Sequence, residues 1–418
     1  MRAVHWFRMY ALAWTWANRY VAPRYSVMRR MPVLSAVLLL GLVGCDGSSA
    51  PTVMVTDSAG IRLTLSPDVS TTFAEVDPEP TLTLGGADAR GPTQFFRIQH
   101  VYVDPQSRLW VADGQSGELR IFQPDGTHWK TRGGRGEGPG EFLRIRLLGP
   151  FNGDSVAVWD DASGRLTVFD PEGEFVRTRR ILSTDDPIPR AFDAFRDGSV
   201  LGQVPRILAA GSLEAGQILG DSVELVRVDL EASTKYPYGA ALGPLWIWTG
   251  RSQIPVPFTA NASFDIYGET VHLVGGPAFR IRVFERGRLS EIYGMERDAR
   301  EVSDADVAAY RRFTEEYIPE SMWSDYLSAL DHPARPKVLP AYSKIIVAAD
   351  GHVWARMYSP DVSAPAVWDV FNGDHEWVGK VQTPGGFMVM SITAEMLIGV
   401  WRDDLGVEHV RRYRLETR

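Results

Sequence analysis

The chain has 418 residues, a formal net charge of -8 at pH 7 and a pI near 5.6. Hydrophobic residues make up 44% of it, enough to bury a substantial core. The acidic balance and the lack of a clustered basic face exclude a nucleic-acid binder, because neutralising phosphates requires such a face. Cys45 is the single cysteine, which excludes intrachain disulfides and Cys-ligated metal sites.

Residues 1–27 are rich in Trp and Arg and precede a signal that is already complete from Met28. We therefore interpret them as an upstream segment with a mis-assigned start, and we expect translation to begin at Met28 or Met31. The alternative is a membrane-surface helix, which Pro23 and the lack of a clean helical period disfavour.

Residues 28–45 have the layout of a bacterial lipoprotein signal peptide. The arginine pair Arg29 and Arg30 precedes an apolar run over residues 33–43, and Gly44 precedes Cys45. About 11 apolar residues are too few to span a bilayer core, which needs roughly 20. A core helix with an incidental cysteine is the alternative. We expect Cys45 to be lipidated, with diacylglyceryl and palmitate-type chains.

The chain after the signal, residues 46–418, is then expected to be tethered to a membrane by its lipid and to face the periplasm. Asp46, directly after the cysteine, resembles an inner-membrane retention signal, and the outer membrane is the alternative. After Cys45 no hydrophobic run approaches membrane-spanning length.

An internal repeat predicts the architecture. Residues 86–126 align without a gap on residues 133–173, at a constant offset of 47 residues. The shared positions include Gly86 with Gly133, Arg97-Ile98 with Arg144-Ile145, Asp113 with Asp160, Phe122 with Phe169 and Gly126 with Gly173. A repeat of this length is typical of one blade of a β-propeller.

Each unit reads as four short antiparallel strands, in the first unit residues 97–103, 109–113, 118–123 and 127–131. Similar first hairpins recur near residues 156, 198, 268, 351 and 395, which makes six. A seventh between Arg206 and Phe258 is the alternative.

The two ends of the chain are predicted to meet in one blade. Residues 81–84 precede Gly85-Gly86 as residues 130–132 precede Gly133-Gly134. They should form the outer strand of a blade whose inner strands come from the C-terminus, leaving no open sheet edge between the first and last blades. The predicted fold is thus an all-β, six-bladed β-propeller with an N-terminal strand closing the last blade.

A helical insertion interrupts the strands at about residues 302–330. Its apolar residues recur at helical spacing, Ser303 and Asp306 offer an N-cap and its capping-box partner, and Pro319 ends the first helix. A second short helix should follow over residues 320–330. The insertion is either a lid over the mouth of the central channel or a brace packed on one blade.

The motifs together resemble the bacterial six-bladed β-propeller lipoproteins, a family similar to NHL-repeat proteins. The resemblance rests on residues 57–60, 133–142, 158–160, 168–173 and 339–354, and covers nearly all of residues 46–418. It implies the fold and the lipid anchor. Relatives of this shape include lactonases, amidating lyases and interaction scaffolds, so it implies no single chemistry.

Four basic residues are predicted to line the central channel: Arg97, His100, Arg144 and Lys344. Such a set could bind an anionic small ligand. The alternative is a structural one, in which Arg97 and Arg144 pair with neighbouring-blade carboxylates such as Asp113 and Asp160.

Other motifs are expected to be structural. The glycines of residues 133–140 lead into a strand, not a helix, so they indicate a tight crossing between blades and not a phosphate loop. The tryptophans at predicted strand positions (Trp110, Trp159, Trp354, Trp368 and Trp401) should pack between blades. No two histidines after the signal share a metal-ligand spacing, so we expect no metal and no cofactor.

The sequence favours a lipid-anchored binding or interaction scaffold over an enzyme, with a protein, peptide or glycan as partner. The alternative is a metal-dependent, lactonase- or lyase-like hydrolytic enzyme with its site in the central channel. Three or more His, Asp or Glu side chains meeting at the channel centre would favour the enzyme.

Overall fold

The computed structural model describes residues 52–180, 190–204, 213–220, 222–229 and 234–417. The upstream segment, the signal peptide and Cys45 lie outside these ranges. Within them, no helix is both long and apolar enough to cross a membrane.

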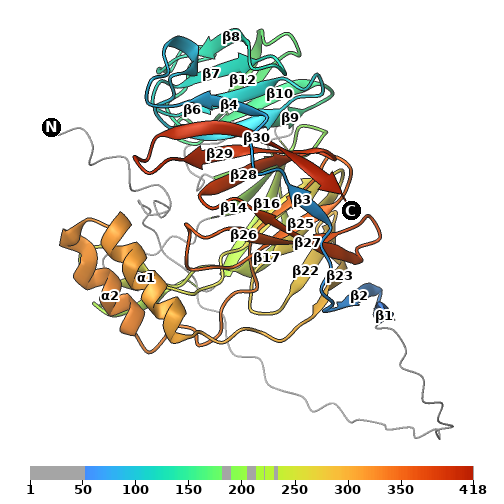
Figure 1. Cartoon of the computed structure of the whole chain (residues 1–418), viewed down its shortest axis with the longest axis vertical. Helices are drawn as coiled ribbons and strands as arrows, with labels where there is room; N and C mark the ends of the chain where they lie inside the picture. Colours follow the sequence, from blue (N-terminus) through green and yellow to red (C-terminus); the bar gives the residue numbers. More distant parts are fainter. Residues whose placement is uncertain (1–51, 181–189, 205–212, 221, 230–233, 418) are drawn as a thin grey trace, which may run out of the picture.

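Most of the described chain forms antiparallel β-sheets that follow one another along the sequence (Figure 1). The two repeat units each form one sheet. The first contains β5 (Ile98–Val103), β6 (Leu109–Asp113), β7 (Glu118–Phe122) and β8 (His128–Gly133), and the second contains β9 (Ile145–Phe151), β10 (Ser155–Asp160), β11 (Arg165–Phe169) and β12 (Phe175–Arg180). These bounds agree with the strands expected from the 47-residue repeat.

Four further sheets repeat this up-and-down order. The third has β13 (Arg190–Ala194), β14 (Val200–Val204), β16 (Ser222–Asp229) and β17 (Thr234–Leu242). The fourth has β20 (Ser263–Tyr267), β21 (Thr270–Val274), β22 (Arg280–Glu285) and β23 (Arg288–Glu296). The fifth has β24 (Tyr342–Val347), β25 (Val353–Met357), β26 (Ala366–Phe371) and β27 (Trp377–Thr383), and the sixth β28 (Phe387–Ile392), β29 (Met396–Arg402) and β30 (Glu408–Thr417).

N-terminal strands are added to two of these sheets. β1 (Met54–Ser58) and β2 (Ile61–Pro67) form a hairpin whose second strand runs parallel to β23. β3 (Ala74–Val76) and β4 (Leu82–Gly85) both pair antiparallel with β30. The beginning and the end of the described chain therefore share a sheet.

Each sheet packs face to face on the next through its own hydrophobic core. Trp110 and Phe169 share the core between the β5–β8 and β9–β12 sheets, while Trp354 and Leu397 share the core between the β24–β27 and β28–β30 sheets. The β28–β30 sheet packs in turn on the β5–β8 sheet through Val400 and Val111. The buried tryptophans thus pack between sheets, as expected, and Trp401 packs partly buried against the same cores.

The first strands of the six sheets contact one another in a closed sequence: β5 with β9, β9 with β13, β13 with β20, β20 with β24, β24 with β28, and β28 with β5. We call these six the first strands. Each of them belongs to a different sheet. We call the region where these six strands contact one another the centre.

The glycine-rich segment after β8 makes a tight connection between two sheets. Gly133 has φ 86°, and a Cβ there would lie 2.8 Å from the carbonyl oxygen of Gly117. No side chain fits in this left-handed conformation against a neighbouring backbone, which accounts for glycine at this position.

The helical insertion has the predicted layout. α1 (Asp304–Tyr317) begins at Ser303, whose hydroxyl accepts from the Asp306 backbone N–H at 3.2 Å while the Asp306 carboxylate accepts from the Ser303 N–H at 2.9 Å. A 3-10 turn and α2 (Trp323–Asp331) follow after Pro319.

The two helices pack on a small sheet that the sequence did not predict. It consists of β15 (Ile218–Leu219), β18 (Trp246–Trp248) and β19 (Gln253–Pro255), and it falls in the region where a seventh blade was the alternative. Ile254 and Phe258 share one core with Tyr310 and Leu330 of the helices. The helices stand out at the side of the sheets in Figure 1 and pack on this small sheet, whereas the brace interpretation placed them on one blade.

Candidate functional site

Two of the four predicted ligand-binding residues are occupied by structural contacts in their own sheets. Arg144 forms an ion pair with Asp161, and Arg146 pairs with the same carboxylate. Arg97 donates from Nη2 to the carbonyl oxygen of Gly114 at 3.0 Å. Both contacts are structural, as the alternative expected, but each lies within one sheet: Arg144 pairs with Asp161 and not Asp160, and Arg97 bonds a backbone carbonyl oxygen.

Asp160 and its repeat mate Asp113 instead cap backbone turns. Asp160 accepts from the backbone N–H groups of Leu143 and Arg144, and Asp113 accepts from the N–H of Phe96. Each carboxylate also accepts from the turn that follows its own strand. The Asp recurs in both units because the same backbone N–H groups require a hydrogen-bond acceptor in each.

His100 and Lys344, the other two predicted residues, lie on first strands and influence one another. Burial lowers the pKa of His100 to about 4, and the positive charge of Lys344 acts in the same direction. The imidazole is therefore neutral at physiological pH, and its buried Nδ1 has no hydrogen-bond partner within the described chain.

Lys344 reaches from β24 to the neighbouring first strand. Its Nζ donates to the carbonyl oxygen of Val389 on β28 at 2.7 Å. Burial lowers its pKa to about 8, although the negative charge of Asp265 opposes this effect. A fraction of the amine is thus uncharged near neutral pH.

Asp193 and Asp265 form a carboxyl pair that the sequence analysis missed. Asp193 lies on β13 and Asp265 on β20, and burial raises the pKa of both. For Asp193 the neighbouring negative charge of Asp265 raises the pKa further. Two neighbouring carboxyl groups disfavour the ionisation of both, which is the direction of the shift at Asp193.

A signal for this pair is present in the sequence. Each Asp follows a phenylalanine and precedes an apolar residue within a first strand, as Phe192-Asp193-Ala194 and Phe264-Asp265-Ile266. A charged residue inside an apolar strand is uncommon unless it has a partner.

These polar side chains bond the backbone of the next first strand. Asp193 accepts from the N–H of Ile266 at 3.0 Å, and Asp265 accepts from the N–H of Val347 at 2.7 Å. Lys344 continues the pattern on β28. These bonds link β13, β20, β24 and β28 in order. They provide hydrogen-bond partners for backbone N–H and C=O groups on strand edges that pair with no other strand.

The chemistry available at this centre is that of two carboxyl groups, one amine and one neutral imidazole. Across the described ranges, no group of three or more His, Cys, Asp or Glu side chains is arranged to hold a metal ion. Three or more such side chains at the channel centre would favour the enzyme interpretation, and the described residues do not supply them.

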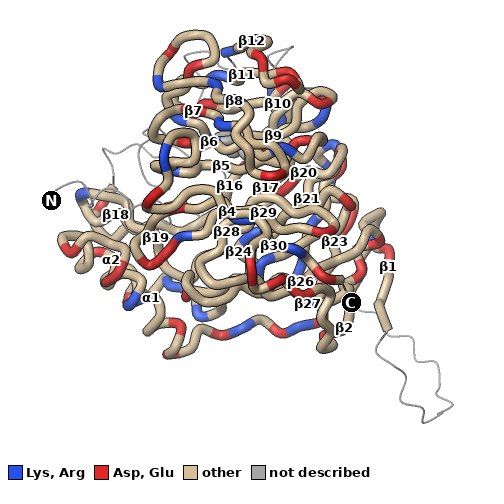
Figure 2. Tube along the Cα trace, turned by 45° about the horizontal axis from the view of Figure 1, so that its top comes forward, with Lys and Arg blue, Asp and Glu red and all other residues tan. Residues whose placement is uncertain are grey.

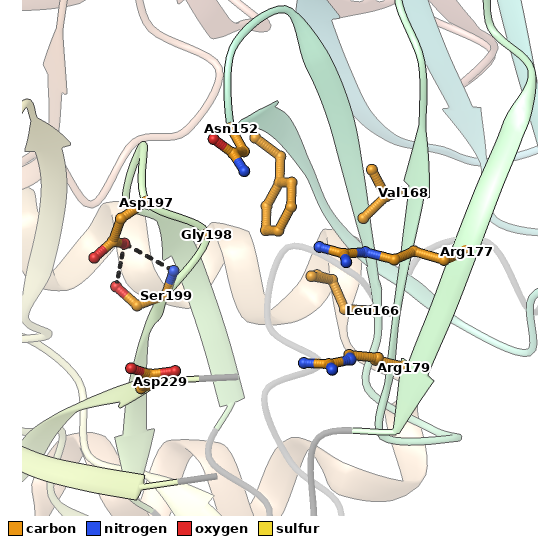
Figure 3. A pocket seen from close by; sticks show the side chains of 10 residues that line it. Asn152, Leu166, Val168, Arg177, Arg179, Asp197, Gly198, Ser199 and Asp229 are labelled. Carbon is orange, nitrogen blue, oxygen red and sulfur yellow. Dashed lines mark hydrogen bonds between the residues drawn. The ribbon is translucent and has the colours of Figure 1, made fainter. Parts of the chain in front are cut away.

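A separate cavity of about 170 Å³ lies between the β9–β12 and β13–β17 sheets. Figure 3 shows Arg177 and Arg179 of β12 pointing from one wall towards Asp197, Ser199 and Asp229 on the other. Asp197 accepts from the hydroxyl of Ser199 and forms an ion pair with Arg227. The sequence analysis did not single out these residues.

Comparisons with known proteins support the fold. The chain matches no protein-family profile and no curated protein sequence. Among solved structures it is similar to a member of the DUF4221 family from Bacteroides vulgatus, with a TM-score of 0.51 and 13% identity over 83% of this chain and 99% of the other.

Two further structures are more distant. One is a protein from Bacteroides fragilis described as exported (TM-score 0.47, 12% identity, 85% of this chain and 98% of that one). The other is a gluconolactonase from Xanthomonas campestris (TM-score 0.40, 12% identity, 76% and 87%). The succession of antiparallel sheets and the likeness to the DUF4221-family structure support a β-propeller fold, and none of the three structures establishes a specific function.

Proposed function

We propose that this protein is a lipid-anchored, six-bladed β-propeller that acts outside the cytoplasm as a binding scaffold. Six face-to-face cores and the closed sequence of contacts among the first strands support six blades. The pairing of β4 with β30 supports closure of the ring between the two ends of the chain.

The binding role rests on one observation: both insertions leave the sheets at the same end. Strand direction alternates within each sheet, so the connections from fourth to first strand and from second to third strand share one end. The helices follow β23, β18 and β19 follow β17, and β15 follows β14. We call this end the insertion face.

Exposed apolar side chains extend the insertion face over three neighbouring sheets. Leu405 is 83% exposed in the connection from β29 to β30, and Val362 is 42% exposed in the connection from β25 to β26. Met388 near the start of β28 and Phe96 just before β5 are also exposed. Apolar side chains flanked by polar residues are typical of a protein-binding surface.

A cross-linking experiment tests this assignment. A photo-reactive amino acid is introduced at Leu405 in the full-length, lipidated protein, and at the exposed Tyr267 on the opposite face as the matched control. We expect a discrete cross-linked product from Leu405 alone. Equal labelling from both positions, or none from either, contradicts a partner at the insertion face.

The lipid anchor has its own test. Intact-mass analysis of membrane-purified protein should give a chain that begins at Cys45 and carries a diacylglyceryl or triacyl adduct. A Cys45→Ser variant should be released from the membrane fraction. A mature protein that still begins at Met1 or Met28 contradicts lipidation.

A further inference from the structure

Two basic side chains of the β24–β27 sheet point towards the β28–β30 sheet. Lys344 and Arg356 lie directly opposite one another in the register of β24 and β25, so they project from the same side. Trp354, two residues before Arg356, projects from that side too and packs in the core shared with the β28–β30 sheet.

A third basic side chain faces them from the other sheet. Arg411 lies opposite Gly399, and Tyr413, two residues further along β30, packs in that same core. Gly399 lies opposite Val389, whose carbonyl oxygen accepts from Lys344. The cross-strand neighbours Val389, Gly399 and Arg411 therefore face the cross-strand pair Lys344 and Arg356 of the other sheet.

These three cations form no ion pair with any described residue. Among the described residues, Lys344 bonds only the Val389 carbonyl oxygen, and Arg356 has no side-chain hydrogen-bond partner. Arg411 donates from Nη1 to the Tyr413 hydroxyl at 3.1 Å and stacks on Trp401, with its guanidinium carbon 3.5 Å from the ring centre. Its Nε is buried without a partner.

Two other arginines with little exposed side chain are compensated. Arg120 pairs with Asp113 and Glu118, and Arg297 pairs with Asp68 and Asp369. Burial of a charge without an ion-pair partner is unfavourable, so three partly buried cations that form no ion pair favour an anion between the two sheets. In the part of the chain that the structure describes, Asp265, whose negative charge acts on Lys344, is the one acidic group that offsets any of them. Burial also lowers the pKa of Arg356, as it does that of Lys344.

We propose that Lys344, Arg356 and Arg411 form a binding site for a small oxyanion that carries at least two negative charges. The planar forks of two arginines suit a phosphoryl or carboxylate group, and the lysine adds a point charge. The site does not depend on a partner at the insertion face, so the two proposals can fail separately.

The test is thermal unfolding of the soluble Cys45→Ser protein in millimolar sodium phosphate, sodium malonate or sodium acetate, each against sodium chloride of equal ionic strength. We expect phosphate or malonate to raise the Tm by several degrees with saturation at millimolar concentration, and acetate to have less effect. Stabilisation by exclusion of salt from the surface does not saturate in this range. A Tm that responds to neither dianion overturns the proposal.

Variants separate a ligand site from a structural role. In Arg356→Gln and Arg411→Gln the rise in Tm should fall to a third or less of its wild-type size. Both variants should melt no lower than wild type in chloride, because each removes an uncompensated buried cation. Arg311→Gln is the control, since Arg311 is half-exposed on α1 and paired with Asp331.

Two outcomes overturn the site assignment. One is a full phosphate response in both variants. The other is that both variants melt at a lower Tm in chloride while the rise in Tm caused by phosphate is unchanged. That result would mean that the arginines contribute to packing alone. Arg356→Lys keeps the charge and should keep most of the rise in Tm caused by phosphate. This variant distinguishes loss of the binding site from poor folding of Arg356→Gln.

Discussion

At the scale of single residues, the polar side chains at the centre have a structural role, because they hydrogen-bond main-chain groups. Asp193, Asp265 and Lys344 each bond a main-chain group of the next first strand. Burial raises the pKa of both carboxyl groups, and the negative charge of Asp265 raises that of Asp193 further, so we expect the pair to retain a proton at a higher pH than a free Asp does.

This pair should make stability depend on pH in a defined direction. An unfolded Asp releases its proton near pH 4, whereas the folded pair retains one at higher pH. The folded state then binds more protons, so the free energy of unfolding falls as pH rises from about 4 through the raised pKa. In Asp265→Asn this fall should be smaller than in wild type, as measured by urea unfolding between pH 4 and 8.

The control for this experiment is Asp374→Asn, at an exposed position in the turn before β27. Its pH profile should match that of wild type. An Asp265→Asn profile parallel to that of wild type would mean that the pair holds no proton in this range.

At the scale of elements, local sequence decides where α1 begins and what holds its first turn. Ser303 and Asp306 bond each other's backbone N–H groups, and the helix then buries Tyr310 and Phe313 against the small sheet. Because this core is formed with β18 and β19 and not within a blade, the insertion should respond to its own cap independently of the ring.

Ser303→Ala should therefore destabilise the insertion by about 1 kcal/mol, the usual cost of losing an N-cap. Hydrogen exchange should show faster exchange in the first turn of α1 and unchanged protection in β5–β8. Faster exchange throughout the β-sheets would instead mean that the insertion and the ring unfold as one unit.

At the scale of the whole molecule, every sheet depends on two neighbours. Val400 and Val410 of the β28–β30 sheet complete the core of the β5–β8 sheet, and β30 also carries the pairing with β4. Loss of β30 should expose the two cores to which it contributes and leave β29 as an open sheet edge.

A chain that ends at residue 403, before β30, should lose its cooperative unfolding transition and not only a part of its stability. Deletion of residues 52–58 is the comparison, since β1 is exposed along its whole length and should change the Tm little. Circular dichroism with thermal melting measures both. A truncated chain that still melts in one sharp transition contradicts a ring held together by its ends.

The central site was predictable only in part. His100 and Lys344 were placed on first strands because the strands follow from the repeat, whereas Arg144 was matched with the wrong carboxylate because Asp160 and Asp161 are neighbours in sequence. Asp193 and Asp265 were missed because the sequence does not show that the two strands carrying them are neighbours in space.

The amino-acid sequence alone was enough to predict the strands of the repeat, the capping box of α1 and the burial of the tryptophans. Each of these depends on short-range periodicity or on contacts within a few residues. The meeting of Asp193 with Asp265, and of Lys344 and Arg356 with Arg411, was decided by the tertiary structure. Asp193 and Asp265 lie on different sheets, as do Arg411 and the pair Lys344 and Arg356, and only the packing of one sheet on the next places the strands that carry them side by side.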